Sequence, residues 1–288
     1  MFRIVFIFVL LLNTAAAQEP IRLIVRADDI GSSQSANEAI ILTATRGIAT
    51  SVEVMVPCPW FPEAVKLLNE HSGIDVGIHL TITSEWEHMK WRPLTDVPSL
   101  TDHNGYFYPM MFPNVNYPGL SIMEVQPSLS DIEKEFRAQI EMGLRLIPHA
   151  SHISGHMGST FFSSEVRALT AQLASEYQLG NDLAGFEVSG LRFVGPKSTG
   201  EEKIDSFLAA VELMEKGKTY LFVEHPALNT SEMQAIYHIG YEDVALDRQG
   251  VTDLFLSSRI KDALLKKGVE LISYREFYQL QKQLSGCR

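Results

Sequence analysis

The amino-acid sequence predicts an α/β fold in which helices cover a parallel sheet that is either closed into a barrel or left open. Two observations lead to this prediction: short β-rich runs alternate with stretches of helical apolar spacing, and no linker, repeat or low-complexity tract divides the chain. The 288 residues, 45% of them hydrophobic, are enough to bury a full core. We therefore expect one domain rather than two.

The expected strands are short runs rich in β-branched and other apolar residues. In chain order they cover residues 21–27, 49–56, 75–82, 151–153, 186–194, 219–223 and 269–273. The expected helices carry apolar residues at intervals of three and four. In chain order they cover residues 36–46, 61–71, 132–146, 164–177, 201–216, 257–267 and 275–283. Strand and helix therefore alternate along most of the chain.

The segment 85–130 interrupts this alternation. It is rich in Pro, Asn, Asp and aromatic residues, and its six prolines break any periodic element. A loop of this length is usually functional or acts as a lid. Its aromatic side chains either stack on a ligand or pack the loop onto the domain, and the sequence leaves both readings open; they are Trp86, Trp91, Tyr106, Phe107 and Tyr108.

The N-terminal segment has the pattern of a secretory signal peptide. Arg3 supplies a positive start, residues 4–12 form an unbroken apolar run, and three alanines precede Gln18. The apolar run is shorter than the roughly 20 residues that a membrane-spanning helix needs, and no later segment is long and apolar enough. We expect residues 1–17 to be removed and the domain, residues 18–288, to be periplasmic or secreted.

The charge balance argues against a nucleic-acid partner. The chain has 24 Lys+Arg against 35 Asp+Glu, a net charge of −11, and no basic run that could neutralise phosphates. An uncharged or cationic partner is easier to accommodate. The two cysteines, Cys58 and Cys287, are far apart in the sequence, and whether they form a disulfide in an oxidising compartment stays open.

Polar residues follow several of the expected strands. Asp28 and Asp29 end the first strand, and two adjacent carboxylates repel each other unless a cation lies nearby. His79 lies in the third strand, and the fourth leads into a segment with His152 and His156. The alternative readings are an aspartate that caps the following helix and histidines that belong to the core. Because strand ends build the sites of parallel α/β proteins, one Asp and two His there favour a divalent ion such as zinc with an open position for water.

His225 follows the strand at residues 219–223 and precedes Pro226. The proline ends the strand and would place His225 at the mouth of the barrel. An imidazole there can donate or accept a proton near neutral pH.

In these motifs the chain resembles the YdjC-like family, the ChbG/HpnK-type carbohydrate deacetylases, which are distant relatives of the NodB-type polysaccharide deacetylases. The family has an Ala-Asp-Asp-Phe-Gly motif, an Asn-Glu helix, a Gly-Ile-Val-Thr-Ser strand, a Gly-Ile-His-Leu-Thr segment, a His-rich segment, a His-Pro strand end and a closing Leu-Ile-Ser-Tyr-Arg-Glu. The matching segments are residues 27–31, 37–38, 47–51, 77–81, the region near 152, 225–226 and 271–276. The ordered agreement covers nearly all of the chain after the signal segment.

The resemblance implies a single-domain, distorted (β/α) TIM-like barrel of the glycoside hydrolase and deacetylase type. It also implies metal-dependent removal of acetyl groups from N-acetylated sugars or oligosaccharides, with zinc or magnesium as cofactor. Carried over residue by residue, it gives Asp29, His79 and His152 as metal ligands, Asp28 as general base and His225 as general acid. Dimers are frequent in the family, which makes a homodimer a candidate state.

The His-rich segment departs from the family pattern. Ser154 stands where the family usually has Asp, and Gly158 and Thr160 stand at later His positions. Outer partners orient metal ligands and tune affinity, so the orientation of the ligands and the substrate stay open. His156 is retained, and it is either a substrate contact or the ligand in place of His152.

Two other functions stay open. One is a carbohydrate-binding protein that keeps the barrel without efficient turnover, although a binder needs neither the general base nor the general acid. The other is an esterase for O-acetyl groups, whose easier leaving group would relax the need for His225. Arg248 resembles a late arginine of the family and would orient the general base or contact the sugar, unless it is a surface residue.

Overall fold

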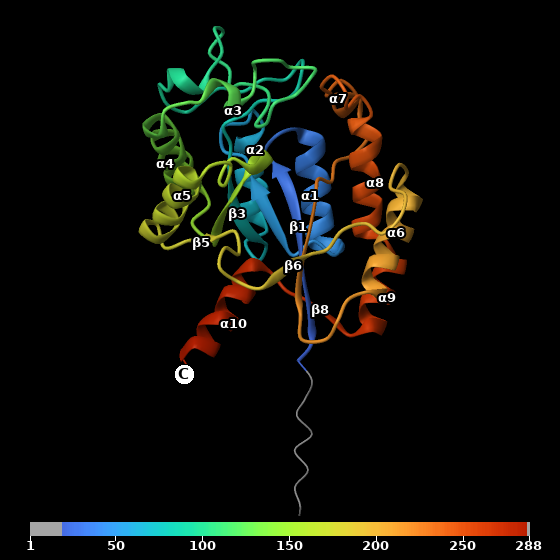
Figure 1. The fold of residues 1–288 in the computed structure, drawn as a ribbon. Helices are drawn as coiled ribbons and strands as arrows, with labels where there is room; N and C mark the ends of the chain where they lie inside the picture. The colour runs from blue at the N-terminus through green and yellow to red at the C-terminus, as the bar shows by residue number, and fades with distance from the viewer. Residues whose placement is uncertain (1–18, 287–288) are drawn as a thin grey trace, which may run out of the picture.

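The strand β1 (Ile21–Ile30) lies in the middle of the domain, and the sheet is built around it (Figure 1). The structure is a computed structural model that describes residues 19–286. β1 is buried at every position except Arg22. Burial along both faces is typical of parallel strands that helices cover on both sides. The expected signal segment, residues 1–17, and Cys287 lie outside the described residues.

All pairings between the strands are parallel, in the order β5-β4-β3-β2-β1-β7-β6, and β8 pairs with the first residues of β1. Within residues 19–286, β5 and β6 are the two edge strands of this order. The sheet curls into a half-barrel that stays open between these two strands. The other strands are β2 (Ser51–Val54), β3 (Asp75–Leu80), β4 (His152–Gly155), β5 (Gly180–Asn181), β6 (Val188–Gly190), β7 (Thr219–Glu224) and β8 (Val269–Leu271). The predicted α/β fold with a distorted, barrel-like parallel sheet is confirmed.

Helices cover the sheet on both sides of the opening, with α4 and α5 on one side and α1, α6, α8 and α9 on the other (Figure 1). The longer helices are α1 (Gln34–Arg46), α2 (Phe61–Glu70), α4 (Leu129–Leu146), α5 (Ser164–Glu176), α6 (Gly200–Glu212), α8 (Val244–Leu256), α9 (Ser258–Lys267) and α10 (Tyr274–Gly286). The short ones are η1 (Pro98–Leu100), α3 (Ile122–Val125), η2 (His156–Gly158) and α7 (Ser231–Gln234). In the part of the chain that the structure describes, no helix is long and apolar enough to cross a membrane.

Four of the longer helices begin at a hydroxyl side chain that accepts a hydrogen bond from a backbone amide of the first turn. Such caps satisfy an amide that has no partner within the helix. The capping residues are Ser33, Ser128, Ser163 and Thr199. The cap at Ser33 starts α1 four residues after the two aspartates, which fixes the turn that follows the central strand.

The sequence did not predict α8, because this helix lacks a single apolar stripe. It packs against α1, α6 and α7, so buried side chains lie on more than one of its faces. Gly250 of α8 approaches Gly200 of α6 so closely that an added Cβ would lie 3.1 Å from the Gly200 Cα. A helix enclosed in this way loses the polar face that makes amphipathic spacing visible.

The segment 85–130 is packed down onto the domain. Glu135 of α4 is fully buried and accepts hydrogen bonds from the backbone amides of Leu94 and Thr95, at 3.0 and 3.1 Å. The indole of Trp91 donates to the carbonyl oxygen of Thr83 at 2.7 Å. Of the five aromatic residues left open above, three are buried and two are half-buried, so they mainly pack the segment; they are Trp86, Trp91, Phe107, Tyr106 and Tyr108.

Candidate functional site

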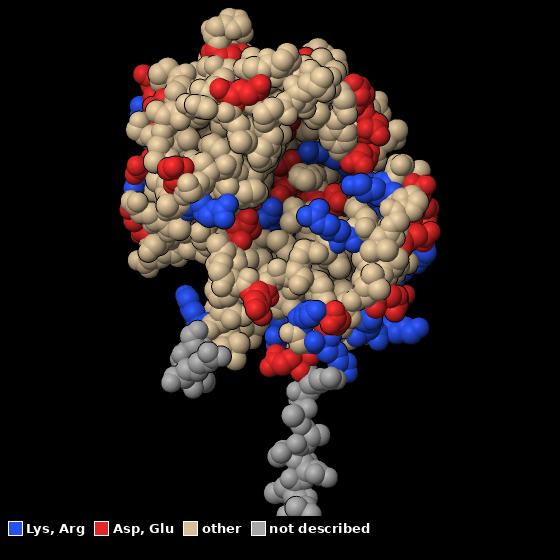
Figure 2. All heavy atoms as spheres, in the orientation of Figure 1, with Lys and Arg blue, Asp and Glu red and all other residues tan. Residues whose placement is uncertain are grey.

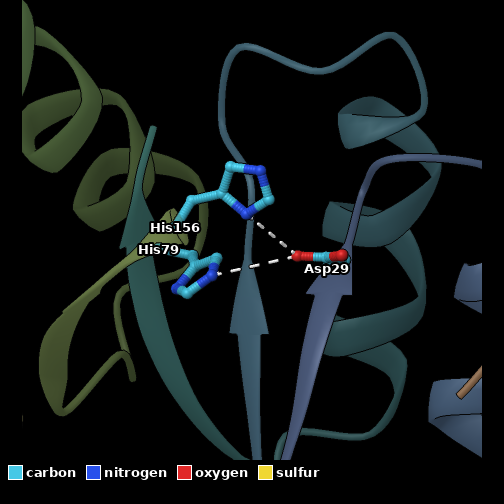
Figure 3. Close-up of side chains that lie close together, drawn as sticks. All are labelled: Asp29, His79 and His156. Atoms are coloured by element: carbon cyan, nitrogen blue, oxygen red, sulfur yellow. Dashed lines mark ion pairs between the residues drawn. The ribbon is translucent and has the colours of Figure 1, made fainter. Parts of the chain in front are cut away.

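Three side chains meet at the carboxyl edge of the sheet: Asp29, His79 and His156 (Figure 3). Asp29 lies near the end of β1, His79 near the end of β3, and His156 begins η2 directly after β4. Oδ1 of Asp29 is 3.3 Å from Nδ1 of His156 and 3.8 Å from Nε2 of His79. All three side chains are buried. The ends of three strands therefore gather one carboxylate and two imidazoles at one point.

The cluster fits a divalent metal ion. Oδ1 of Asp29 is buried and has no hydrogen-bond partner among the described residues. A buried carboxylate oxygen in that position is costly unless something compensates it. One ligand atom from each of the three residues lies within 4.8 Å of the others, and ligands about 2.0–2.2 Å from a zinc ion are spaced by distances of this order. Two imidazole nitrogens and one carboxylate oxygen would leave a fourth position open, as catalytic zinc sites do.

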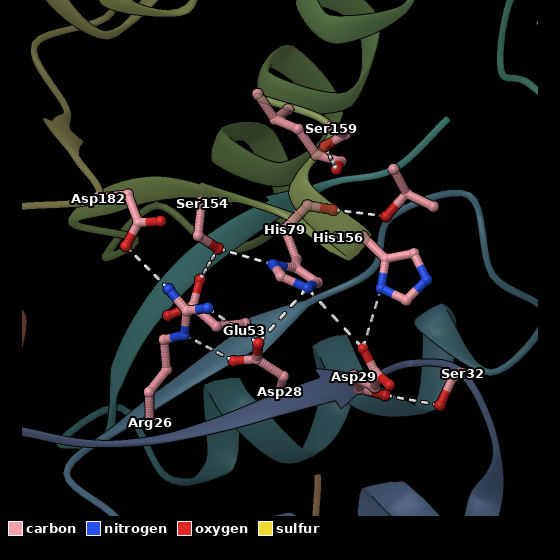
Figure 4. A network of polar contacts seen from close by, with 12 residues as sticks. Arg26, Asp28, Asp29, Ser32, Glu53, His79, Ser154, His156, Ser159 and Asp182 are labelled. Atoms are coloured by element: carbon pink, nitrogen blue, oxygen red, sulfur yellow. Dashed lines mark hydrogen bonds and ion pairs between the residues drawn. The ribbon is translucent and has the colours of Figure 1, made fainter. Parts of the chain in front are cut away.

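A kink at the end of β1 turns both aspartates toward the cluster. Neighbouring residues of a regular strand point to opposite faces. The register of β1 against β2 shifts over the last four residues of β1, and Asp29 has a φ of 79°, in the left-handed region. The amide and hydroxyl of Ser32 donate to the carbonyl oxygen of Asp29, at 3.1 and 2.7 Å. Asp28 and Asp29 consequently both lie within 3.8 Å of Nε2 of His79 (Figure 4).

Each aspartate has its own arginine. Nη2 of Arg26 donates to Oδ2 of Asp28 at 3.0 Å. Nη2 of Arg248 donates to Oδ2 of Asp29 at 2.9 Å, and its guanidinium lies over the ring of Trp86 at 5.2 Å. Arg248 is therefore buried and contacts Asp29, whereas Asp28, the expected general base, is oriented by Arg26. The surface reading of Arg248 is wrong.

The two carboxyl groups have opposite pKa shifts. Burial raises the pKa of Asp28 to about 8, although the guanidinium of Arg26 opposes this shift. Burial acts in the same sense on Asp29, but Arg248 and His225 outweigh it and hold the pKa of Asp29 well below its ordinary value. A cation in the cluster would lower the pKa of Asp28, which would let both carboxylates be ionised together.

His152 lies outside the cluster. Its Nε2 is 2.7 Å from Oε1 of Glu53 and its Nδ1 is 2.8 Å from Oγ of Ser151, so both ring nitrogens have protein partners. Its ring stacks on Tyr274 with a centroid separation of 3.9 Å. In the sheet register it pairs with Gly77, two residues before His79. His156, the alternative that the sequence left open, lies in the cluster with Asp29 and His79, and His152 does not.

His156 has a carboxylate on its far side. Its Nε2 is 3.1 Å from Oε2 of Glu85, while its Nδ1 faces Asp29. Burial lowers the pKa of His156, but Glu85 and Asp29 outweigh it and raise the pKa to about 10. A carboxylate behind a histidine is the arrangement that commonly orients metal-ligating imidazoles. A metal ion would have to displace the proton from Nδ1, because metals bind the neutral ring.

His225 follows β7, the neighbour of β1, at the same edge of the sheet. β7 pairs with β1 up to Ala27 and Glu224, so His225 stands next to the strand end that carries Asp28. Burial lowers the pKa of His225 to about 4, and Asp29 only partly opposes this shift. The imidazole is therefore neutral at pH 7.

The face shown in Figure 2 is hollowed near its centre, with acidic atoms inside the hollow and Lys and Arg atoms at its edge. A cavity of about 520 Å³ is lined by residues of β6, β7 and the segment between β6 and α6, including Leu191, Phe193, Lys197 and Glu224. Glu224 directly precedes His225. The volume lies within the range of about 300–1,000 Å³ that ligand pockets occupy.

Sequence reasoning did not single out Arg26, Glu53 or Glu85. Arg26 and Glu53 are charged residues within otherwise buried strands, and a charge in such a strand needs a partner, which is the signal that could have identified them. Glu85 is the first residue of the Pro-rich segment 85–130. No spacing connects it to His156, which lies 71 residues later.

The fold and the cluster together define an α/β protein with a candidate metal site of the kind that hydrolases use. A comparison with protein families matches residues 22–266 to the family described as YdjC-like protein. The chain therefore belongs to the YdjC-like family, and the resemblance is confirmed.

Curated relatives and a solved structure match the chain over most of its length. A carbohydrate deacetylase of Geobacillus stearothermophilus is 29% identical over 274 residues, covering 89% of this chain and 98% of the relative. A carbohydrate deacetylase of Clostridium beijerinckii is 27% identical, covering 88% and 99%. A crystal structure from Enterococcus faecalis V583, provisionally described as a cellobiose-phosphate cleavage protein, has a TM-score of 0.71 at 23% identity and covers 90% of this chain and 99% of its own. The structural match supports the fold.

Proposed function

We propose that the protein is a metal-dependent hydrolase that removes the acetyl group from an N-acetylated sugar or oligosaccharide. The observation that carries this proposal is the buried cluster of Asp29, His79 and His156, with Asp28 and His225 at the same edge of the sheet. Full-length relatives named carbohydrate deacetylases support the substrate class. A protein that only binds sugars needs no acid–base pair beside three candidate ligands.

Asp29, His79 and His156 would hold the divalent ion, zinc or magnesium. When bound, such an ion polarises a carbonyl group and lowers the pKa of a water molecule. Nε2 of His79 and Oδ1 of Asp29 present lone pairs to the site, and Arg248 on Oδ2 prevents Asp29 from turning away. Glu85 holds the ring of His156 from behind in the same way.

Asp28 would act as the general base and His225 as the general acid. Arg26 fixes the carboxylate of Asp28 by contacting both of its oxygens, so Oδ2 is positioned 3.7 Å from the ligand atom of His79 and can accept a proton from water there. His225 is neutral at pH 7, so the proton that it passes to the departing amine has to reach it during the reaction. Asp28, which accepts a proton from water, is the group that can supply this proton to His225.

The hollowed face supplies room for a sugar substrate. The 520 Å³ cavity is lined by Glu224, the residue before His225, and its lining combines an aromatic ring with charged side chains. Aromatic faces and hydrogen-bonding groups are what a sugar ring contacts in a binding site. With the N-terminal segment acting as a secretory signal, the substrate would be a periplasmic or extracellular glycan fragment.

The test is acetate release by the purified protein from a panel of N-acetylated sugars and oligosaccharides. The measurement is repeated after treatment with a chelator and after zinc or magnesium is restored. We expect release that the chelator abolishes and the metal restores. Asp28→Asn should bind the metal but release acetate about 10²–10⁴-fold more slowly. Release that persists without metal, or metal binding without release from any substrate, would contradict the proposal.

An O-acetyl esterase is the second candidate, and the neutral state of His225 favours it. An ester has a better leaving group than an amide, so it depends less on a general acid. The same panel with O-acetylated sugars separates the two activities. A His225→Ala variant should lose N-deacetylation strongly, whereas a small loss on esters would identify the esterase.

A further inference from the structure

The interior of the half-barrel contains a charged residue that the proposed reaction does not use, Glu53 of β2. In the register of three adjacent strands, Glu53 lies beside Gly77 of β3, and Gly77 lies beside His152 of β4. The side chains of Glu53 and His152 meet across the glycine. A Cβ on Gly77 would lie 2.2 Å from Oε2 of Glu53 and 2.5 Å from Nε2 of His152. Only glycine at this position allows the pair to form.

The two oxygens of Glu53 have different partners. Oε1 is 2.7 Å from Nε2 of His152. Oε2 accepts a hydrogen bond from the hydroxyl of Ser154 (Figure 4). A contact that only balanced the charge of His152 would need one oxygen. The second oxygen is directed at Ser154, which pairs with His79 in the next row of the sheet. Glu53 therefore connects the deep row of the sheet to the row that carries the candidate ligand.

The direction of the hydrogen bonds determines the tautomer of His79. His152 outweighs burial and lowers the pKa of Glu53 to about 2, so Glu53 only accepts. Ser154 gives its single hydroxyl proton to Glu53, and its oxygen must therefore accept from Nδ1 of His79, 2.7 Å away. His79 then carries its proton on Nδ1, and Nε2 presents a lone pair to Asp28 and Asp29.

We propose that Glu53, acting through the hydroxyl of Ser154, is the positioning residue for His79, which it holds in the Nδ1–H tautomer with Nε2 directed into the metal cluster. The inference rests on the proposed metal site. It also explains the departure at Ser154, where the family usually has Asp. In this chain a carboxylate on β2 reaches the imidazole through that serine.

The test compares two serines that differ in what they contact. Ser154→Ala removes the hydroxyl between Glu53 and His79, whereas the control Ser151→Ala removes a hydroxyl that contacts His152 and Asp75. Zinc affinity is measured by competition with a chromophoric chelator, alongside the unfolding midpoint of each variant. We expect Ser154→Ala to weaken zinc binding about 10–100-fold and Ser151→Ala to leave it unchanged. Equal affinities for the two variants would overturn the proposal.

A spectroscopic measurement on the metal-free protein tests the tautomer itself. In nitrogen–proton correlation spectra of the imidazoles, His79 should show a proton on Nδ1 in the unmodified chain. Ser154→Ala should move His79 toward the Nε2–H form, and Glu53→Gln should do so more weakly, because the amide oxygen still accepts from Ser154. An unchanged tautomer in Ser154→Ala would overturn the proposal. If the unmodified chain bound no metal, the proposed function would fail, but this measurement would still decide the role of Glu53.

A rescue experiment separates positioning from general damage to the core. The double variant Glu53→Gln/Ser154→Asp puts a carboxylate directly beside His79 without placing two charges together. We expect its zinc affinity to recover at least about tenfold relative to Ser154→Ala, within the range that outer partners contribute. The single variant Ser154→Asp should not recover, since two buried carboxylates would then repel each other. A zinc affinity of the double variant as low as that of Ser154→Ala would contradict the proposed action of Glu53 on His79 through Ser154.

Discussion

The two histidines of the cluster are supported by different parts of the molecule. His79 lies inside β3, and its partners come from the neighbouring strands: Ser154 of β4 and, through it, Glu53 of β2. His156 lies just beyond β4 in the short helix η2, and its partner Glu85 comes from the loop that leaves β3. One candidate ligand is thus fixed by the register of the sheet, and the other by a loop packed onto the domain.

This difference explains which ligand could be predicted. Strand ends are visible in a sequence, so His79 was placed at the edge of the sheet from its position alone. The order of depth between His152 and His156 depends on how β4 pairs with β3, and that pairing puts His152 beside Gly77 rather than at the edge. Local spacing does not contain this register.

The largest effect is expected at Asp29, the residue that faces both histidines of the cluster. Asp29→Ala removes the one carboxylate that faces both His79 and His156. We expect specific zinc binding to disappear and acetate release to fall to the level of the chelated protein. Equilibrium dialysis with metal analysis measures the first, and the acetate assay the second. A variant that still binds one zinc ion per chain would show that the three residues are not the ligand set.

Gly77→Ala disrupts the contacts within the sheet that support His79. The new methyl group would overlap Glu53 and His152, so we expect a loss of about 1–3 kcal/mol in the free energy of unfolding, measured by denaturant titration. Gly73→Ala is the matched control, because an added Cβ there meets no heavy atom within 4 Å. Equal stability of the two variants would mean that Glu53 and His152 do not meet across β3 as described.

Glu85→Gln tests how the loop supports His156, and the measured quantity is the number of protons released when a metal ion binds. Burial and His156 lower the pKa of His79, so that ring is already neutral, whereas Glu85 helps to raise the pKa of His156 to about 10. Below that pH a metal ion must displace the proton of His156. Calorimetry at pH 7 in buffers of different ionisation enthalpy should therefore find fewer protons released by Glu85→Gln than by the unmodified chain. Identical proton release from the two proteins would show that Glu85 does not hold a proton on His156.

The smallest effect is expected at the anchor of the loop. Thr95→Val removes a 2.6 Å hydrogen bond from the threonine hydroxyl to Glu135, while the backbone amides of Leu94 and Thr95 still hold that carboxylate. We expect a loss of about 0.5–1.5 kcal/mol in the free energy of unfolding, with zinc affinity unchanged. A large loss of zinc affinity would show that the loop transmits strain to Glu85 and His156.

The sequence predicted the alternation of strands and helices and the polar strand ends, because both depend on local patterns. It missed α8, whose burial on several faces hides the apolar stripe, and β5, which has only two residues. It also missed three residues that orient the site, Arg26, Glu53 and Glu85. Glu53 and His152 are 99 positions apart, and Glu85 and His156 are 71 positions apart, so only the folded chain brings them together.

The central claim is that Asp29, His79 and His156 form the metal site and that His152 does not. Zinc-edge anomalous diffraction from crystals of the zinc-loaded protein tests it most directly. We expect one peak about 2.0–2.2 Å from Oδ1 of Asp29, Nε2 of His79 and Nδ1 of His156, with His152 still bonded to Glu53. A peak on Nε2 of His152, with its bond to Glu53 broken, would contradict it.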